Sequence, residues 1–108
     1  IKRGYLQEGV IGNMLSVPGN DRLPVYRLWS AKAGDHFYTT SDTEARATGL
    51  PREGIIGYVY SSPSSSRSPF YRLNNTTIGD HFYTTSATER TSVMGNGYKA
   101  EGIMGYLP

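Results

Sequence analysis

Cysteine is absent from this chain of 108 residues. Its absence excludes disulfides, thiolate nucleophiles and zinc sites built from cysteine. It leaves the cellular compartment open, because a secreted protein need not contain disulfides. With 37% hydrophobic residues, the chain has the size of one domain with one modest core.

Runs of one charge and long apolar runs are also missing. Eleven basic and nine acidic residues are scattered along the chain and leave a formal charge of +2, so we expect no nucleic-acid partner. No apolar run approaches the roughly 18 residues that span a bilayer, so we expect no membrane insertion. The N-terminal residues IKRGYLQEG lack the apolar core of a signal peptide, and we expect that any export signal was removed or never existed.

Tyrosine and glycine are abundant instead, and part of the chain is repeated. There are nine Tyr and thirteen Gly against three Phe and one Trp. Tyr-Arg-Leu at 26–28 recurs at 71–73, and the string GDHFYTTS at 34–41 recurs unchanged at 79–86. Both recurrences have the same offset, which indicates duplication of one structural unit.

A third pattern, G-x-x-x-E-G-x-x-G, begins at Gly4, Gly49 and Gly97, and we call it the tail motif. The first copy has neither Tyr-Arg-Leu nor GDHFYTTS before it. The sequence therefore predicts a single repeat domain, 1–108, divided into a partial first repeat (1–22), a second repeat (23–62) and a third repeat (63–108).

Local signals assign elements to each repeat. S-x-x-E at 41–44 and 86–89 is a capping box, which predicts a short helix after each GDHFYTT. The runs YRLW and HFYTT, separated by a short segment that ends in Gly-Asp, predict a β-hairpin before the helix. EGIIGYVY and its relatives are apolar on both faces, which predicts a strand in the interior of the fold. We expect a mainly β (α+β) fold of β-β-α-β repeats with short capped helices.

The first repeat is incomplete, because it has the tail motif without a hairpin or a helix. Repeats of this kind usually cannot bury their faces alone. We therefore expect either a missing N-terminal segment that completes the first repeat or a second chain that supplies it in a homo-oligomer. We expect the repeats to lie around a pseudo-threefold axis, and the Ser/Pro-rich run at 61–69 to be a flexible link.

The two histidines lie in Asp-His dipeptides at 35–36 and 80–81, which invites a metal site or an acid/base pair as one interpretation. Neighbouring residues on a strand point to opposite faces, so one dipeptide does not place both side chains on one ion. Helix capping accounts for Ser41 and Ser86, and no nucleophile elbow or phosphate loop occurs. We expect no metal, cofactor or catalytic residue. In the other interpretation, Asp closes the hairpin turn while His packs beside Tyr.

Each hairpin also supplies the kinds of side chain that bind sugars. Planar amphipathic rings cover the C–H faces of a sugar, while carboxylates, amides and Arg hydrogen-bond its hydroxyls. The expected ligand-binding residues are Asp35, His36, Tyr38, Arg27 and Trp29 on the first hairpin, and Asp80, His81, Tyr83, Arg72 and Asn74 on the second. Plain core packing is an equal explanation for Trp29.

The two arginines in these sets have an alternative role. Arg27 and Arg72 follow Tyr in Tyr-Arg-Leu and so lie on the opposite face of the strand. Each is predicted to form an internal ion pair with Glu53, Glu101 or Glu8 of a tail motif, in preference to a ligand contact.

The combination of YRL, GDHFYTTS followed by x-T-E, and G-Y-x-x-E-G-x-x-G-Y resembles a tandem-repeat family of uncharacterised function found in secreted bacterial and fungal proteins. The resemblance covers nearly the whole chain. Units of that family commonly come in threes and are often attached to secreted hydrolases. The resemblance therefore implies an extracellular accessory or lectin-like domain, and it carries over no catalytic residue.

The expected function is that of a secreted, non-catalytic carbohydrate-binding (lectin-like) or cell-surface adhesion module. Its expected partners are glycans or cell-wall polysaccharide, because duplicated shallow sites increase avidity without catalysis. The alternative is a structural or protein-interaction domain, such as an inhibitor of a secreted enzyme.

Overall fold

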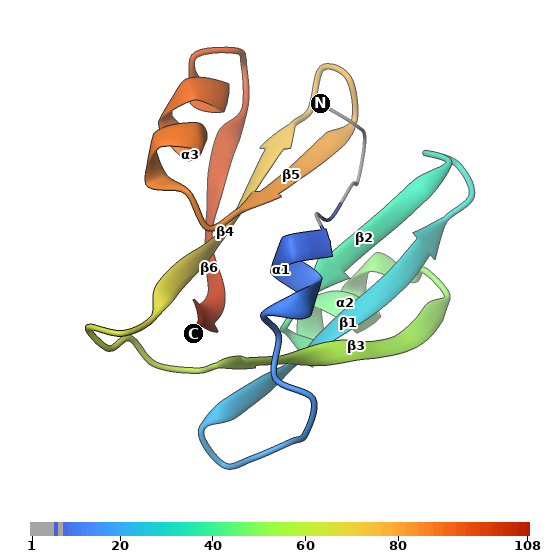
Figure 1. The fold of residues 1–108 in the computed structure, drawn as a ribbon. Coiled ribbons are helices and arrows are strands. Elements are labelled where there is room, and N and C mark those ends of the chain that lie inside the picture. The colour runs from blue at the N-terminus through green and yellow to red at the C-terminus, as the bar shows by residue number, and fades with distance from the viewer. Residues whose placement is uncertain (1–5, 7) are drawn as a thin grey trace.

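The computed structural model describes residue 6 and residues 8–108. Six strands form one antiparallel sheet in the order β2-β1-β3-β6-β4-β5, which curls into half a barrel (Figure 1). The elements of the described residues, in chain order, are α1 (Glu8–Gly12), β1 (Arg22–Ser30), β2 (Asp35–Thr39), α2 (Asp42–Thr48), β3 (Arg52–Tyr60), β4 (Ser68–Asn75), β5 (Asp80–Thr84), α3 (Ala87–Met94) and β6 (Lys99–Leu107). The prediction of a mainly β fold is confirmed.

Residues 22–60 and 68–107 follow the same order of strand, strand, helix, strand. In each segment the first strand lies between the other two, since β1 pairs with β2 and β3 while β4 pairs with β5 and β6. The two segments join where Tyr60 of β3 pairs with Tyr106 of β6. All six strands therefore belong to one continuous sheet. The Ser/Pro-rich link is shorter than expected, because β4 already begins at Ser68.

The two predicted helices begin at their capping serines. The Ser41 side chain accepts the Glu44 N–H at 3.0 Å, and Gly49, with φ of 68°, ends α2 in the left-handed conformation. The Glu side chain does not return to the cap. Instead, the Ser41 N–H donates to Thr39 Oγ1 at 3.0 Å, and the Thr39 hydroxyl donates to Glu44 Oε1 at 2.5 Å. The same contacts recur around Ser86. Threonine thus replaces the Glu half of the box and leaves the Glu44 carboxylate able to bind another partner.

The first tail motif contains a helix, so the prediction of a strand there is wrong. Residues 8–12 form α1, and Val10 packs in the core. In β3 and β6 the tail motif pairs with the hairpin strand of its own repeat, which satisfies its backbone N–H and C=O groups. At residues 8–12 a helical turn satisfies these groups instead. Leu15, just beyond, still pairs with Tyr58. The start of the motif at Gly4 lies outside the described residues.

The strands β3 and β6 lie at the centre of the sheet, as their apolar sequences predict, but their first halves are not buried. Ile55 and Ile103, at equivalent positions of the tail motif, are each 48% exposed. The expectation of an interior strand is therefore correct only for the second half of each. There, Val59 and Leu107 are fully enclosed.

The core consists of two apolar clusters. The larger joins both repeats, since Val25 and Val59 from the first segment pack with Phe70 and Leu107 from the second, and Val10 of α1 packs against the same cluster. Figure 1 shows α1 lying between the two halves of the sheet. The smaller cluster lies within the last repeat and comprises Leu73, Phe82, Val93 and Tyr98. Burial of each such side chain stabilises the fold by about 1.5–3 kcal/mol.

Gly105 of β6 packs closely against β3, and a substitution there tests this packing. A Cβ atom at Gly105 would lie 2.3 Å from Val59 Cγ2 and 3.0 Å from the Tyr60 carbonyl oxygen, whereas one at Gly12, the same position of the tail motif, would meet no atom within 4 Å. Gly105→Ala is therefore expected to lower the free energy of unfolding by about 1–3 kcal/mol through overpacking. Gly12→Ala should leave it unchanged or raise it slightly. Equal thermal unfolding temperatures for the two variants would contradict this packing.

Candidate functional site

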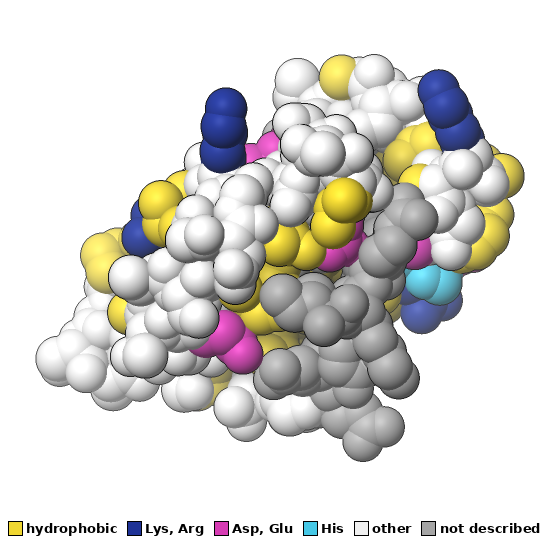
Figure 2. Space-filling view, turned by 90° about the horizontal axis from the view of Figure 1, so that it is seen from above, with side chains coloured by type: hydrophobic (Ala, Val, Ile, Leu, Met, Phe, Trp, Pro, Cys, Tyr) yellow, Lys and Arg dark blue, Asp and Glu magenta, His cyan; other side chains and the backbone are white. Residues whose placement is uncertain are grey.

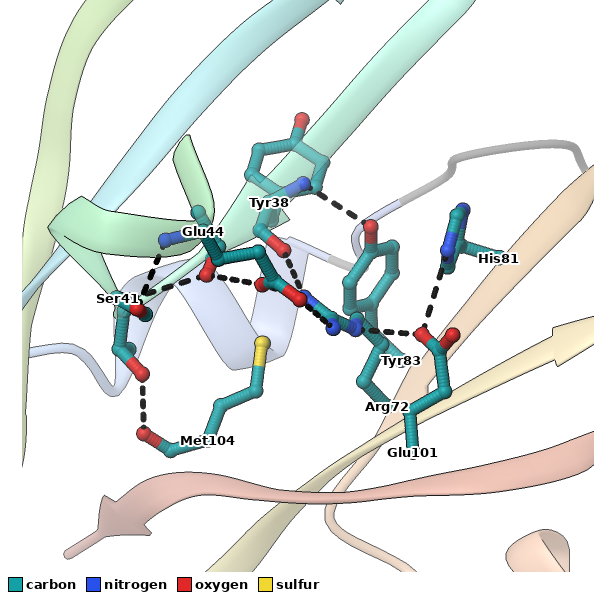
Figure 3. A network of polar contacts seen from close by, with 10 residues as sticks. Tyr38, Ser41, Glu44, Arg72, His81, Tyr83, Glu101 and Met104 are labelled. Atoms are coloured by element: carbon teal, nitrogen blue, oxygen red, sulfur yellow. Dashed lines mark hydrogen bonds and ion pairs between the residues drawn. The ribbon is translucent and has the colours of Figure 1, made fainter. Parts of the chain in front are cut away.

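Arg72 on β4 is the centre of a polar network between the repeats (Figure 3). Its side chain is only 9% exposed. Nη1 and Nη2 donate to the two carboxylate oxygens of Glu44 at 2.7 Å each, and Nε donates to Glu101 Oε1 at 2.7 Å. Nη1 also donates to the Tyr38 carbonyl at 3.1 Å. One guanidinium therefore binds carboxylates from both repeats, with a bidentate contact to Glu44.

The edge strand β2 is held by side chains of the following repeat. The Tyr38 N–H donates to Tyr83 Oη at 3.0 Å, while the Tyr38 carbonyl accepts from Arg72. The two tyrosine rings meet edge to face at 5.3 Å, and Phe37 lies 4.8 Å from the Arg72 guanidinium. Burial raises the pKa of both phenols, so they stay neutral donors and acceptors in this contact.

The charges in this network shift one another. The hydrogen bond from Arg72 is the main cause that lowers the pKa of Glu44, against the opposing effect of burial. Burial would lower the pKa of Arg72, but the hydrogen bond to Glu44 and the charge of Glu101 raise it. Burial lowers the pKa of His81, although Glu101 opposes the shift. The network is therefore built from an ionised Arg and Glu with a neutral imidazole beside them.

An equivalent cluster lies on the first hairpin. Glu53 Oε1 is 3.0 Å from Arg27 Nε and 2.8 Å from His36 Nε2. The His36 ring meets Trp29 edge to face at 5.0 Å and lies 6.2 Å from the Tyr38 ring. Four of the five ligand-binding residues expected on this hairpin are thus brought together on one face of β1 and β2.

The predicted internal ion pairs are confirmed for two of the three glutamates. Arg27 pairs with Glu53, and Arg72 pairs with Glu101. In each case the partner is the Glu of the tail motif of the same repeat. The side chain of Glu8 lies outside the described residues.

The two clusters differ in what covers them. The Arg27 side chain is 41% exposed against 9% for Arg72. Among the described residues, no hydrogen bond engages the guanidinium of Arg27, because Glu53 lies at ion-pair distance from Nε without hydrogen-bond geometry. The residue opposite the histidine is Trp29 in the first hairpin and Asn74 in the second. The guanidinium of Arg27 is therefore open to a ligand, whereas that of Arg72 is occupied by the carboxylate of Glu44.

Most of the second expected set is internal. Asp80 is 1% exposed and accepts a hydrogen bond from the Tyr98 hydroxyl at 2.5 Å, which together with burial raises the pKa of Tyr98 to about 12. Tyr83 is equally buried. His81 stacks beside Tyr83 at 6.3 Å, in agreement with the interpretation of His packing next to Tyr. Only His81 and Asn74 of this set keep partly exposed surface, whereas Asp35 of the first set is half-buried.

A pocket of about 220 Å³ lies beside the Arg72 network. Its walls are the end of β2 and start of α2 on one side, and Arg72, Glu101 and Met104 on the other. The Thr40 hydroxyl donates across it to the Met104 carbonyl at 2.7 Å. The polar groups of this pocket hydrogen-bond to one another, so they hold the repeats together.

Further surface features of the described residues are few. No group of three or more His, Asp or Glu side chains in this part of the chain is placed to hold a metal ion. None of the described helices is long and apolar enough to cross a membrane. On the face shown in Figure 2, Lys and Arg side chains are separated by neutral surface.

Comparison with known families places the whole chain in one of them. The model of the Domain of unknown function (DUF5648) matches residues 1–108. The chain belongs to the DUF5648 family. Neither a curated protein nor a solved structure matches this DUF5648 domain.

Sequence reasoning missed the part of Glu44 in the network of this DUF5648 domain. The capping box accounted for Glu44 locally, and its contact with Arg72 joins residues that are 28 positions apart. The available signal was that Thr39 and Thr84 also recur with the motif. A threonine that accepts the cap N–H releases the glutamate for a distant partner.

The Arg72 network of the DUF5648 domain predicts a pH-dependent stability. Because the pKa of Glu44 is lowered in the folded state, its contribution is present above the ordinary value of 4.5 and is lost as the pH falls through the folded pKa. Glu44→Gln should lower the free energy of unfolding at pH 7 by about 1–2 kcal/mol, a figure reduced because the side chain is 39% exposed. The deficit should shrink as the pH falls below 4.5.

Glu89→Gln is the matched control, since Glu89 occupies the same position of α3 and bonds Thr84 without an arginine among the described residues. Urea unfolding of both variants from pH 7 to pH 3 measures the difference. A deficit of Glu44→Gln that is no larger than that of Glu89→Gln at pH 7 contradicts the role of the network.

Proposed function

We propose that this DUF5648 domain is a secreted, non-catalytic carbohydrate-binding module that binds its ligand on the first hairpin. The observation that carries the proposal is the open cluster of Arg27, Trp29 and His36, in which the indole ring contacts His36, and His36 and Arg27 share one oxygen of Glu53. An aromatic face covers the C–H face of a sugar, and guanidinium and imidazole donors take its hydroxyls. Glycans or cell-wall polysaccharides are the proposed partners.

We further propose that the repeats are arranged around a pseudo-threefold axis. Two strand pairings support it. Leu15 and Tyr60 each stand three residues after the last Gly of a tail motif, and Tyr58 and Tyr106 each stand one residue after it. The pairs Leu15–Tyr58 and Tyr60–Tyr106 therefore join successive tail motifs in the same register.

Protein interaction is a second candidate function, and a different observation favours it. Ile55 and Ile103 are both 48% exposed at equivalent positions of adjacent central strands. Within the described residues, the two strands pair antiparallel only at Tyr60 and Tyr106, so the isoleucines lie on opposite sides of this junction and offer a partner two separate apolar contacts. A partner held through them would stay bound in the presence of free sugars, whereas a glycan-bound complex would be released.

The carbohydrate proposal is tested by Trp29→Ala with Asn74→Ala as the matched control, because the two residues lie opposite the equivalent histidines. Binding is measured on a glycan array and by affinity electrophoresis in soluble cell-wall polysaccharides. Loss of the indole should weaken binding by about tenfold, while Asn74→Ala binds as the unaltered protein does. A blank array together with unretarded migration in every polysaccharide sinks the proposal, as does unchanged binding by Trp29→Ala.

A further inference from the structure

The contacts around Arg72 on the second hairpin indicate which kind of group would bind at Arg27 on the first hairpin. Around Arg72, the tail-motif glutamate takes Nε, and Nη1 and Nη2 are left to bind a second carboxylate, that of Glu44, at 2.7 Å each. The ring of Phe37 lies 4.8 Å from the same guanidinium. The carboxylate of Glu44 and the aromatic ring of Phe37 therefore surround this guanidinium.

The cluster on the first hairpin has the same arrangement, except that among the described residues Arg27 has one carboxylate partner where Arg72 has two. Arg27 has its tail-motif glutamate, Glu53, at 3.0 Å from Nε, and a histidine shares the same oxygen. Arg27 Nε is buried without a hydrogen-bond partner, no hydrogen bond between described residues engages Nη1 or Nη2, and the side chain as a whole is 41% exposed. The neighbouring Glu53 does not prevent a second carboxylate from binding, since Glu101 and Glu44 share one arginine in the second repeat.

Trp29 is the one residue of the open cluster that the occupied cluster lacks. Its counterpart there is Asn74, so only the first hairpin carries an aromatic ring opposite its histidine. The ring is in contact with His36 at 5.0 Å, which fixes it next to the polar groups. An indole surface favours the C–H face of a pyranose ring over a flexible acidic side chain.

From these contacts we infer that the first hairpin binds an acidic polysaccharide through a uronic-acid residue. The carboxylate of the uronate accepts from Nη1 and Nη2 of Arg27, as Glu44 does from Arg72. The pyranose ring lies against Trp29, and its hydroxyls reach His36. The formal charge of +2 on the chain adds a weak attraction for such a polymer. This inference rests on the proposed carbohydrate-binding function and names the class of sugar.

A carboxylate from a second copy of the chain is the competing occupant. Glu89 of α3 corresponds to Glu44, and Thr84 holds it in the same way as Thr39 holds Glu44. Docking of that surface on Arg27 would reproduce the contact between the two repeats. It would make no use of the exchange of Asn74 for Trp29, so the sugar is the occupant that the open cluster favours.

Isothermal titration with tetragalacturonate, and with its fully methyl-esterified form, tests the inference on the whole chain. The free acid should bind, and esterification should weaken binding by about tenfold or more because the neutral ester lacks the charge-assisted hydrogen bonds. Arg27→Met should cause the same loss, and Arg27→Lys should fall between, since an ammonium keeps the charge without the fork. Arg46→Met, which removes an exposed arginine of α2 outside both hairpins, is the matched control and should bind as the unaltered protein does.

Each other outcome has a defined meaning. Equal binding of acid and ester, or binding of neutral glycans alone, overturns the uronate assignment and leaves the carbohydrate proposal standing. Binding of tetragalacturonate that Arg27→Met does not weaken also overturns the assignment. Failure of every glycan to bind overturns both. Self-association by sedimentation that Glu89→Gln abolishes, without sugar binding, identifies a second copy as the occupant. Should Arg27→Met fail to fold, the comparison of acid and ester on the unaltered protein decides.

Discussion

The burial of one guanidinium, that of Arg72, fixes how the two complete repeats are joined. A buried cation is tolerated only when its donors are paired, so Glu44 and Glu101 must both stay in place. These contacts set α2 and β6 relative to β4. The availability of Glu44 depends in turn on Thr39, which takes over the cap N–H of Ser41. The capping contact between Thr39 and Ser41 thus affects how α2 is held against β4 through Glu44 and Arg72.

Local patterns predicted the elements of the fold well wherever an element is stabilised by its own neighbours. The hairpins, the capping serines and the strands at 52–60 and 99–107 all lie where the sequence indicates. The prediction of a strand at 8–12 was wrong: these residues form a helix, whereas the same motif in β3 pairs with β1, and a short apolar motif does not itself encode its partners. The sequence also did not predict that the first halves of β3 and β6 are exposed, because an apolar strand sequence does not reveal whether other elements cover the strand.

The candidate site shows a further limit of sequence patterns. Arg27 and Arg72 stand in identical tripeptides, yet one is open and the other is enclosed by the preceding repeat. The tripeptides are identical, whereas the position of each strand in the sheet decides what surrounds its arginine. Pairing of arginine with the tail-motif glutamate could be predicted, because both partners belong to one repeat. The bond to Glu44 could not, since it joins two repeats.

The hydrogen bonds of Arg72 and Tyr83 to the backbone of Tyr38 affect the tendency of the edge strand β2 to pair with another chain. A strand at the border of a sheet offers free backbone groups to any other extended chain, and this is a common route to aggregation. In β2 the backbone N–H and carbonyl of Tyr38 are taken by the side chains of Tyr83 and Arg72. Side chains of β4 and β5 therefore protect the border of the sheet at β2 from pairing with another chain.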